Sequence, residues 1–247
     1  MLPNLSNLTL TSNLSSPIEW KQKSPFPNQQ NKRTASNCHP SLPPGLLSLG
    51  MAKAQRKKAS KKELILRRAA VMFREKGFAA TSMRDLAEMV GIEAASLYNH
   101  IRSKNEILEA ICFDVANIFN TNIETTEASN QKAITKIDNL LRFHIRQMIE
   151  NYEEVYVSDR EWKHLEEPYL SNFQTQRRNY RKKFAAIIEE GIAKNEIRKI
   201  DAPTAVLIIL HAISGIESWH RSRAKINAQE LEDNMVMIMI DGLRKHA

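Results

Sequence analysis

Residues 89–104 read MVGIEAASLYNHIRSK, and their order of apolar and polar side chains decides how this part of the chain folds. Gly91 ends one helical pattern, and EAASLYNHI begins another. In the second pattern Leu97 and Ile101 lie one turn apart and face a core, whereas the Tyr-Asn-His step between them is polar. We therefore expect a short helix that is anchored by two apolar residues and turns its polar groups outward.

The stretch just before it, TSMRDLAEMVG at residues 81–91, predicts another short helix. Thr81 or Ser82 is the expected N-cap, and Ser82 with Asp85 resembles a capping box, in which each side chain accepts the other residue's backbone N–H. The small side chain of Ala87 permits the two helices to cross closely. Two short helices around a glycine turn form a helix-turn-helix, whose second helix enters the major groove of DNA.

Helical periodicity continues along most of the chain from Lys61 onward, and we find no convincing strand and no internal repeat. The sequence therefore predicts an all-α fold of about nine helices. The remaining helices are expected at residues 61–77, from Ser103 onward, and at 132–150, 151–165, 169–195, 201–220 and 228–245.

Composition divides the chain into four segments. Residues 1–50 hold seven of the nine prolines and eight serines. A segment of this composition cannot bury enough apolar surface to offset the entropy of ordering, so we expect a disordered tail. A start at Met51 is the alternative, in which case that tail is mis-assigned sequence. Residues 51–60 form a basic arm, 61–104 a three-helix domain with the helix-turn-helix, and 105–247 a second helical domain.

Charge is distributed unevenly between these segments. Residues 51–104 carry thirteen Lys and Arg against five Asp and Glu, whereas residues 105–247 carry nineteen against twenty-two. A basic domain joined to a mildly acidic one suggests that the first binds a polyanion. Solvated lysines on a helix face would give the same count, so charge alone leaves both interpretations open.

Several classes of protein are disfavoured by what the sequence lacks. It has no continuous apolar run of about eighteen residues, which predicts no membrane span, and no secretory signal. Cys38 and Cys112 lie far apart, so a disulfide framework is not expected and a reducing cytoplasm fits. Neither cysteine has a basic neighbour, the histidines are scattered, and no Gly-rich phosphate loop occurs. We expect no catalytic residue, metal site or cofactor, and no enzymatic activity.

Two longer stretches, AAVMFREKGFAATSMRDLAEMVGI and SLYNHIRSKNEIL, combine a Phe-x-x-x-Gly-Phe step, a Thr before Arg-Asp-Leu-Ala, and a Lys at the start of the fourth helix. Together they make residues 62–108 resemble the DNA-binding domain of the TetR/AcrR family of transcriptional repressors. The resemblance implies an all-helical homodimer, in which each N-terminal domain reads half of a palindromic operator in double-stranded DNA. It also implies that residues 105–247 bind an inducer and form the dimer interface.

The side chains expected at DNA come from the residue pattern and from this resemblance. Tyr98 and His100 can donate to phosphate oxygens, and Lys104 lies in a first helical turn, where the backbone already favours an anion. The resemblance places Arg84 and Asn99 at positions that face bases or the nearby backbone, and Asn99 can pair with an adenine edge. The full expected set is Thr81, Ser82, Arg84, Ala94, Ala95, Ser96, Tyr98, Asn99, His100 and Lys104.

Residues 177–220 resemble the subgroup of this family that senses acyl-CoA thioesters, which implies an acyl-CoA or fatty-acid inducer. An acyl chain needs an apolar tunnel, and a CoA head group needs cations such as the basic run at residues 177–183. Plain core packing and a solvated basic face are the alternatives. The expected ligand contacts are Phe143, Met148, Arg177, Arg178, Arg181, Phe184, Ile188 and Leu207.

Two C-terminal stretches, TAVLIILHAISGIESW and LEDNMVMIMIDGL, carry more apolar surface than one domain of this size can bury. We expect a dimer interface centred on Ile213, Ile216, Met235 and Met239. Two functions remain open, a ligand-responsive repressor and a ligand-independent DNA-binding protein of the same fold. A pocket of roughly several hundred cubic ångströms that reaches the basic helix would favour the first, and a filled core the second.

Overall fold

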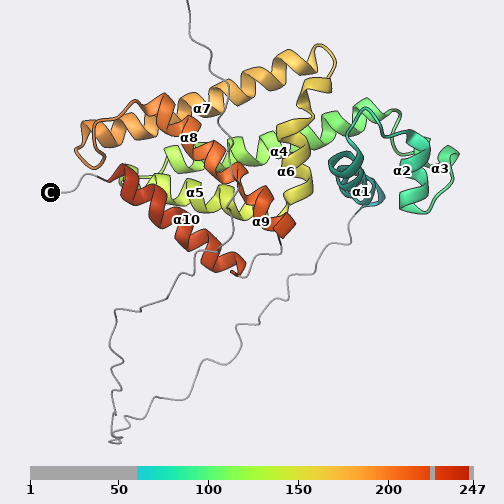
Figure 1. The fold of residues 1–247 in the computed structure, drawn as a ribbon. Coiled ribbons are helices and arrows are strands. Elements are labelled where there is room, and N and C mark those ends of the chain that lie inside the picture. Colours follow the sequence, from blue (N-terminus) through green and yellow to red (C-terminus); the bar gives the residue numbers. More distant parts are fainter. Residues whose placement is uncertain (1–59, 223–225, 245–247) are drawn as a thin grey trace, which may run out of the picture. The chain divides into compact units, whose positions relative to one another are not determined.

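The computed structural model describes residues 60–222 and 226–244, which are mostly helical (Figure 1). The predicted disordered tail, the Met51 start and nearly all of the basic arm lie outside the described residues. The elements are α1 (Lys61–Lys76), α2 (Met83–Val90), α3 (Ala94–Tyr98), α4 (Lys104–Glu127), α5 (Ala133–Glu150), α6 (Tyr152–Arg160), the 3-10 helix η1 (Trp162–His164), α7 (Tyr169–Ala193), α8 (Ala202–Ser214), α9 (Ile216–Ser222) and α10 (Ala228–Leu243).

The all-α prediction is confirmed. The helix predicted at residues 201–220 is a run that breaks at Gly215 into α8 and α9, and the expected number of about nine helices agrees if this run is counted once. Over residues 60–222 and 226–244, extended pairing is limited to one antiparallel bridge between Ile197 and Arg244.

Local capping chemistry sets where several helices begin. The Ser82 hydroxyl accepts the Asp85 N–H at 3.2 Å, and the Asp85 carboxylate accepts the Ser82 N–H at 2.8 Å, which completes the predicted capping box. Ser103 caps α4 and Asp201 caps α8 through their side-chain oxygens. Gly91 ends α2 at a positive φ of 74°, a conformation that favours glycine.

Two apolar cores hold the described helices together. One surrounds Phe73, Leu86 and Leu97, and it also takes in side chains of α4 and of the segment around α6 and α7, such as Val157 and Phe173. The other fills the space between α5, α7, α8 and α10. Because the first core is shared, the helix-turn-helix packs directly on helices that belong to the second half of the chain.

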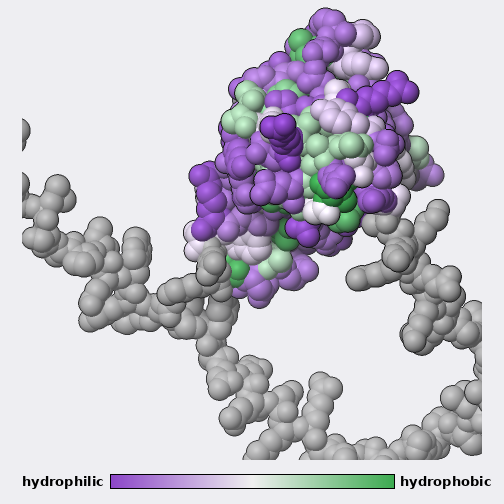
Figure 2. All heavy atoms as spheres, turned by 90° about the vertical axis from the view of Figure 1, so that its right-hand side faces the viewer, coloured by the Kyte–Doolittle hydropathy of each residue, from purple (hydrophilic) through white to green (hydrophobic). Residues whose placement is uncertain are grey.

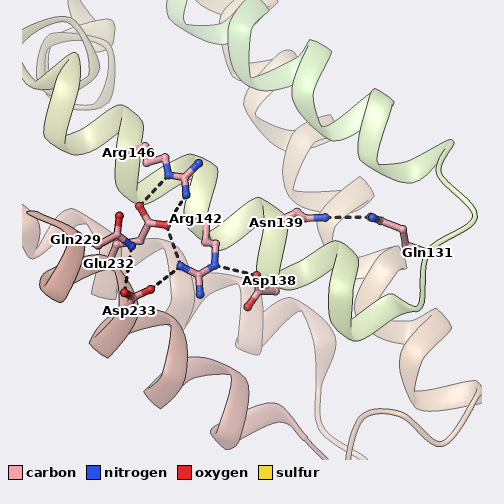
Figure 3. A network of polar contacts seen from close by, with 8 residues as sticks. All are labelled: Gln131, Asp138, Asn139, Arg142, Arg146, Gln229, Glu232 and Asp233. Atoms are coloured by element: carbon pink, nitrogen blue, oxygen red, sulfur yellow. Dashed lines mark hydrogen bonds and ion pairs between the residues drawn. The ribbon is translucent and has the colours of Figure 1, made fainter. Parts of the chain in front are cut away.

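An ion-pair network fixes α10 against α5 (Figure 3). Glu232 of α10 is only 3% exposed, and its carboxylate accepts hydrogen bonds from Arg142 at 2.9 Å and from Arg146 at 2.8 Å. Arg142 also donates to Asp138 and to Asp233. The hydrogen bond from Arg146, with Arg142 beside it, holds the pKa of Glu232 below its usual value. A buried carboxylate that is satisfied twice specifies how these two helices align.

By length and composition alone, the run Ala202–Ser222 could cross a membrane. This is weak evidence, because the core helices of other proteins pass the same test. In this chain the outer face of the run is one of the apolar surfaces described below.

Candidate nucleic-acid interface and ligand pocket

Helix α3 turns a mostly polar face outward, as the sequence predicts. Leu97 is fully buried and Ile101 is 1% exposed, so these two residues anchor the helix to the core. Tyr98 is 52% exposed, and Ala95, Asn99 and His100 are also exposed. The helix ends at Tyr98, earlier than expected, so Asn99 and His100 lie in the turn that follows. Figure 2 faces the end of the described region that carries α2 and α3, and its surface is mainly hydrophilic.

The start of α2 separates the two alternatives that the sequence leaves open for its N-cap. Ser82 is exposed and is the N-cap. Thr81 is 2% exposed, and its hydroxyl donates to the Gly77 carbonyl at 2.9 Å. The resemblance implies a phosphate contact by Thr81 or Ser82; in this arrangement the Thr81 hydroxyl is buried and already bonded, and Ser82 is the exposed one of the two. On α2, Arg84 is exposed beside Ser82 and keeps its predicted access to DNA.

The loop between α1 and α2 is held from two sides through Phe78. From α4, the Lys104 ammonium donates to the carbonyls of Phe78 and Thr81, each at 2.8 Å, and lies 4.4 Å from the centre of the Phe78 ring. From the other side, the Glu161 carboxylate accepts the Phe78 N–H at 3.3 Å. A phosphate contact by Lys104 would have to replace one of these bonds, a constraint that the sequence did not indicate.

A cavity of about 440 Å³ lies among α4, α5, α6, α7 and the α8–α9 run. Its wall combines apolar side chains with a band of polar ones from α6 and α7. The apolar lining consists of Val115, Ala116, Phe119, Met148, Val155, Phe173, Leu207, Leu210 and Ile213. A volume of this size accommodates a drug-sized molecule, which is the outcome expected for a ligand-responsive protein.

Half of the predicted ligand contacts line this cavity. They are Met148, Arg177, Arg181 and Leu207. The other four are Phe143, Arg178, Phe184 and Ile188, and none of them is among the lining residues. Phe184 and Ile188 are fully buried in the core, and Arg178 is exposed on another face of α7. The lining of the cavity along α7 ends at Arg181.

Three arginines line the cavity, and they differ in how they are already paired. Arg160 pairs with Glu217 at 3.2 Å. Arg177 donates to Asp159 at 2.8 Å and lies 5.6 Å from the centre of the Trp162 ring. Arg181 is exposed, and within residues 60–222 and 226–244 it forms no ion pair. Arg181 is therefore the cation on this wall that is available to an anionic ligand. In the same part of the chain, no group of three His, Cys, Asp or Glu side chains could hold a metal ion.

The cavity wall also contains a buried polar pair that the sequence analysis missed. A ring nitrogen of His144 on α5 is hydrogen-bonded to the hydroxyl of Tyr180 on α7, and both residues line the cavity. Burial lowers the pKa of His144 to about 3 and raises the pKa of the Tyr180 hydroxyl. The available signal was a histidine on the apolar face of α5, next to Leu140, Leu141 and Ile145.

The exposed apolar surface of α8 and α10 is not centred where the sequence predicted. Ile213 and Ile216 are each 2% exposed, so they belong to the core of one protomer and cannot be the centre of an interface. Met235 and Met239 pack against the same core. The exposed large apolar side chains on these helices are Leu207, Ile208, Met237 and Ile238, from 50% to 68% exposed. We call these four residues the α8–α10 face.

Two family models match the chain. The model described as "Bacterial regulatory proteins, tetR family" matches residues 65–111, and the model described as "Tetracyclin repressor-like, C-terminal domain" matches residues 130–243. The first match covers most of the helix-turn-helix domain, and the second covers α5 to α10, which include all the helices around the cavity except α4.

Two curated relatives are transcriptional regulators. The HTH-type transcriptional repressor KstR2 of Mycolicibacterium smegmatis is 24% identical over 187 residues, which cover 75% of this chain and 91% of that protein. The negative transcriptional regulator IcaR of Staphylococcus aureus is 28% identical over 165 residues, which cover 64% of this chain and 82% of that protein.

Solved structures share the fold. The ketosteroid transcriptional regulator KstR2 of Mycobacterium tuberculosis superposes with a TM-score of 0.71 at 22% identity, and the match covers 77% of this chain and 98% of that one. AibR in complex with isovaleryl coenzyme A and operator DNA gives a TM-score of 0.65 at 19% identity, covering 72% and 97%. At these identities the two structures establish the helical architecture.

Proposed function

Because the chain belongs to the TetR family of bacterial regulatory proteins, whose members bind operator DNA as dimers, we propose that it is a repressor released by a ligand. In this proposal, α2 and α3 of two copies read the halves of a palindromic operator in the cytoplasm. An amphipathic anion such as an acyl-CoA or a fatty acid occupies the cavity and lowers the affinity for DNA. Residues 61–104 supply the DNA-binding domain, and residues 105–247 supply the ligand-binding and dimerisation domain.

The DNA-binding part rests on the polar groups that α2 and α3 turn outward. Ser82, Tyr98 and His100 are exposed where they can reach phosphates, and Arg84 and Asn99 are exposed where they can reach base edges. Phosphate contacts set affinity and its salt dependence, whereas base contacts set specificity. Asn99→Ala therefore costs about 1–3 kcal/mol on the preferred operator and little on random DNA. An equal loss on both kinds of DNA would remove the base-reading role from Asn99.

The observation that carries the ligand part is the cavity of about 440 Å³, with apolar walls and Arg181 at its lining. An acyl chain fits apolar walls, and a carboxylate or phosphate fits an unpaired guanidinium. The solved AibR structure contains isovaleryl coenzyme A together with operator DNA, which supports the same chemical class here. The alternative, a ligand-independent DNA-binding protein, requires a filled core, and the open cavity disfavours it.

Ligand binding can reach the DNA-binding helices through α6. This helix contributes Tyr156 and Asp159 to the cavity wall, and it is followed by Glu161, whose carboxylate accepts the N–H of Phe78 in the loop between α1 and α2. A ligand that displaces α6 therefore displaces the loop that positions α2. Such a ligand acts only by binding the DNA-incompetent arrangement more tightly than the other. A coupling of about 1–3 kcal/mol corresponds to a roughly 5- to 150-fold loss of operator affinity.

The decisive experiment sequences genomic DNA fragments bound by the purified protein, with and without acyl-CoAs of increasing chain length. We expect a palindromic site that is released by at least one of them. Arg181→Ala should remove the release and leave operator binding intact, because the residue lines the cavity, and no residue of α2 or α3 does. Arg178→Ala is the matched control, because Arg178 is an exposed arginine of the same helix and lies outside the cavity lining. If no acyl-CoA or fatty acid binds in calorimetry, the ligand class is wrong.

A further inference from the structure

The buried pair of His144 and Tyr180 forms a polar spot in the wall of the cavity. His144 is 8% exposed and Tyr180 is 7% exposed, and both line the cavity. Aromatic rings surround the pair: the Phe119 ring centre lies 4.5 Å from that of His144, and the Phe184 ring centre lies 6.5 Å from it. The pair is therefore shielded from bulk water and faces the space in which the proposed ligand lies.

A count of polar hydrogens shows that one hydrogen-bond donor of the pair stays unpaired. A neutral imidazole carries one N–H and a phenol carries one O–H, so the pair holds two polar hydrogens. The hydrogen bond between the two side chains uses one of them. If Tyr180 donates, the remaining hydrogen is on the other ring nitrogen of His144. If His144 donates, the remaining hydrogen is on the Tyr180 oxygen. Either tautomer leaves one donor, so the pair needs an acceptor.

The pair is also uncharged. Burial lowers the pKa of His144 to about 3 and raises the pKa of Tyr180, so neither group ionises near neutral pH. An anion placed here would be desolvated against two neutral groups, neither of which supplies a compensating charge, and this is costly. An anionic group belongs instead at Arg181, the next residue along α7. The acceptor that suits the pair is a neutral oxygen.

We propose that His144 and Tyr180 form a second polar anchor in the inducer pocket, which recognises a keto, hydroxyl or ether oxygen carried on the apolar part of the ligand. This inference rests on the proposed inducer role of the cavity. The anchor distinguishes ligands by whether they carry an acceptor oxygen. A plain hydrocarbon chain leaves the spare hydrogen unpaired, whereas an oxygen at the matching position accepts it. Sites built to hydrogen-bond a ligand oxygen discriminate strongly against analogues without one.

A pair of neutral probes tests the anchor without using the anion site. Cyclooctanone and cyclooctane have similar shapes and differ by a carbonyl oxygen. Their affinities for the full-length protein are measured by NMR titration, and the ratio of the two affinities is the readout. The double variant His144→Phe/Tyr180→Phe removes both polar hydrogens, so we expect the ratio to fall about tenfold. Tyr156→Phe is the matched control, because it removes a hydroxyl from another side chain of the same cavity and should leave the ratio unchanged.

The infrared carbonyl stretch of cyclooctanone bound to the wild-type protein gives a second measurement, which does not depend on any variant folding. A hydrogen bond lowers its frequency relative to the frequency in a hydrocarbon solvent. A stretch at the hydrocarbon value, an unchanged ratio in the double variant, or no binding of the ketone would overturn the anchor. These outcomes are independent of the acyl-CoA titrations: failure of every CoA thioester with a retained ketone preference would remove the anionic ligand class and leave the anchor in place.

Discussion

At the scale of single residues, the side chain of Lys104 is hydrogen-bonded to backbone carbonyls of the loop between α1 and α2. Its ammonium satisfies carbonyls of Phe78 and Thr81 that no helix could pair, because both lie in the loop between α1 and α2. A third carbonyl, that of Ala79, lies at 3.4 Å. A lysine has three N–H donors, so these carbonyls use all of them.

We expect Lys104→Ala to act mainly on stability. Hydrogen bonds to a charged group contribute about 1.5–3 kcal/mol where they are buried, and the half-buried ammonium places the loss near the lower end of that range. The variant should unfold at lower denaturant concentration and bind all DNA sequences more weakly. The slope of log affinity against log salt should stay unchanged. The control Arg102→Ala removes a nearby exposed charge, and its slope also stays unchanged if that side chain makes no contact with DNA. A slope that falls by about 0.9 in Lys104→Ala would instead establish a phosphate contact.

His144 makes the stability of the protein depend on pH. Its pKa is about 3 in the folded chain against 6.5 for an ordinary histidine, so the unfolded chain binds more protons between these values. The free energy of unfolding therefore falls as the pH drops below about 6.5, by about 2 kcal/mol at pH 5 relative to pH 7. In His144→Gln this part of the pH dependence should be absent from denaturant titrations. Parallel pH profiles for the two proteins would contradict a neutral, buried imidazole.

At the scale of elements, the starts of several helices were predictable from the sequence, and the extent of the cavity along them was not. Ser82, Ser103 and Asp201 cap helices through contacts with residues three positions away, so the sequence contains the whole signal. Along α7 the lining of the cavity ends at Arg181, whereas Phe184 lies one turn beyond Tyr180 on the same side of the helix, in the core. The hydrophobic pattern marks that side of α7 and does not show how far along it the cavity extends. For that reason half of the predicted ligand contacts proved to lie outside the lining.

A prediction at the scale of elements concerns the contact between Glu161, which follows α6, and the α1–α2 loop. If Glu161 transmits the response, Glu161→Ala should keep operator affinity within about threefold and lose most of the release by ligand. The control is Glu167→Ala, because among the described residues the Glu167 carboxylate accepts hydrogen bonds only from Ser171, in its own segment. Both variants are compared by fluorescence anisotropy on labelled operator with and without the ligand. An intact ligand response in Glu161→Ala would rule out this route.

At the scale of the whole molecule, we expect two copies of the protein to pair through the α8–α10 face. Ile208 is 62% exposed and Ile238 is 68% exposed, so water contacts them unless a second copy covers them. Ile208→Glu with Ile238→Glu should give folded monomers in sedimentation that no longer bind the operator. Ile118→Glu is the control, since Ile118 is an isoleucine of similar exposure on α4 and should leave the dimer intact. Wild-type protein that sediments as a monomer at micromolar concentration would refute the arrangement.

Leu207 belongs both to the wall of the cavity and to the α8–α10 face. In a dimer joined through that face, the partner therefore supports one wall of each cavity, and a dissociated protomer loses that support. Mass action then links the two equilibria: dilution that separates the protomers also changes the apparent dissociation constant of the inducer. Titrations at several protein concentrations should give different apparent constants. If the cavity takes an inducer as proposed, the amount of the protein in the cell then helps to set the inducer concentration at which the operator is released.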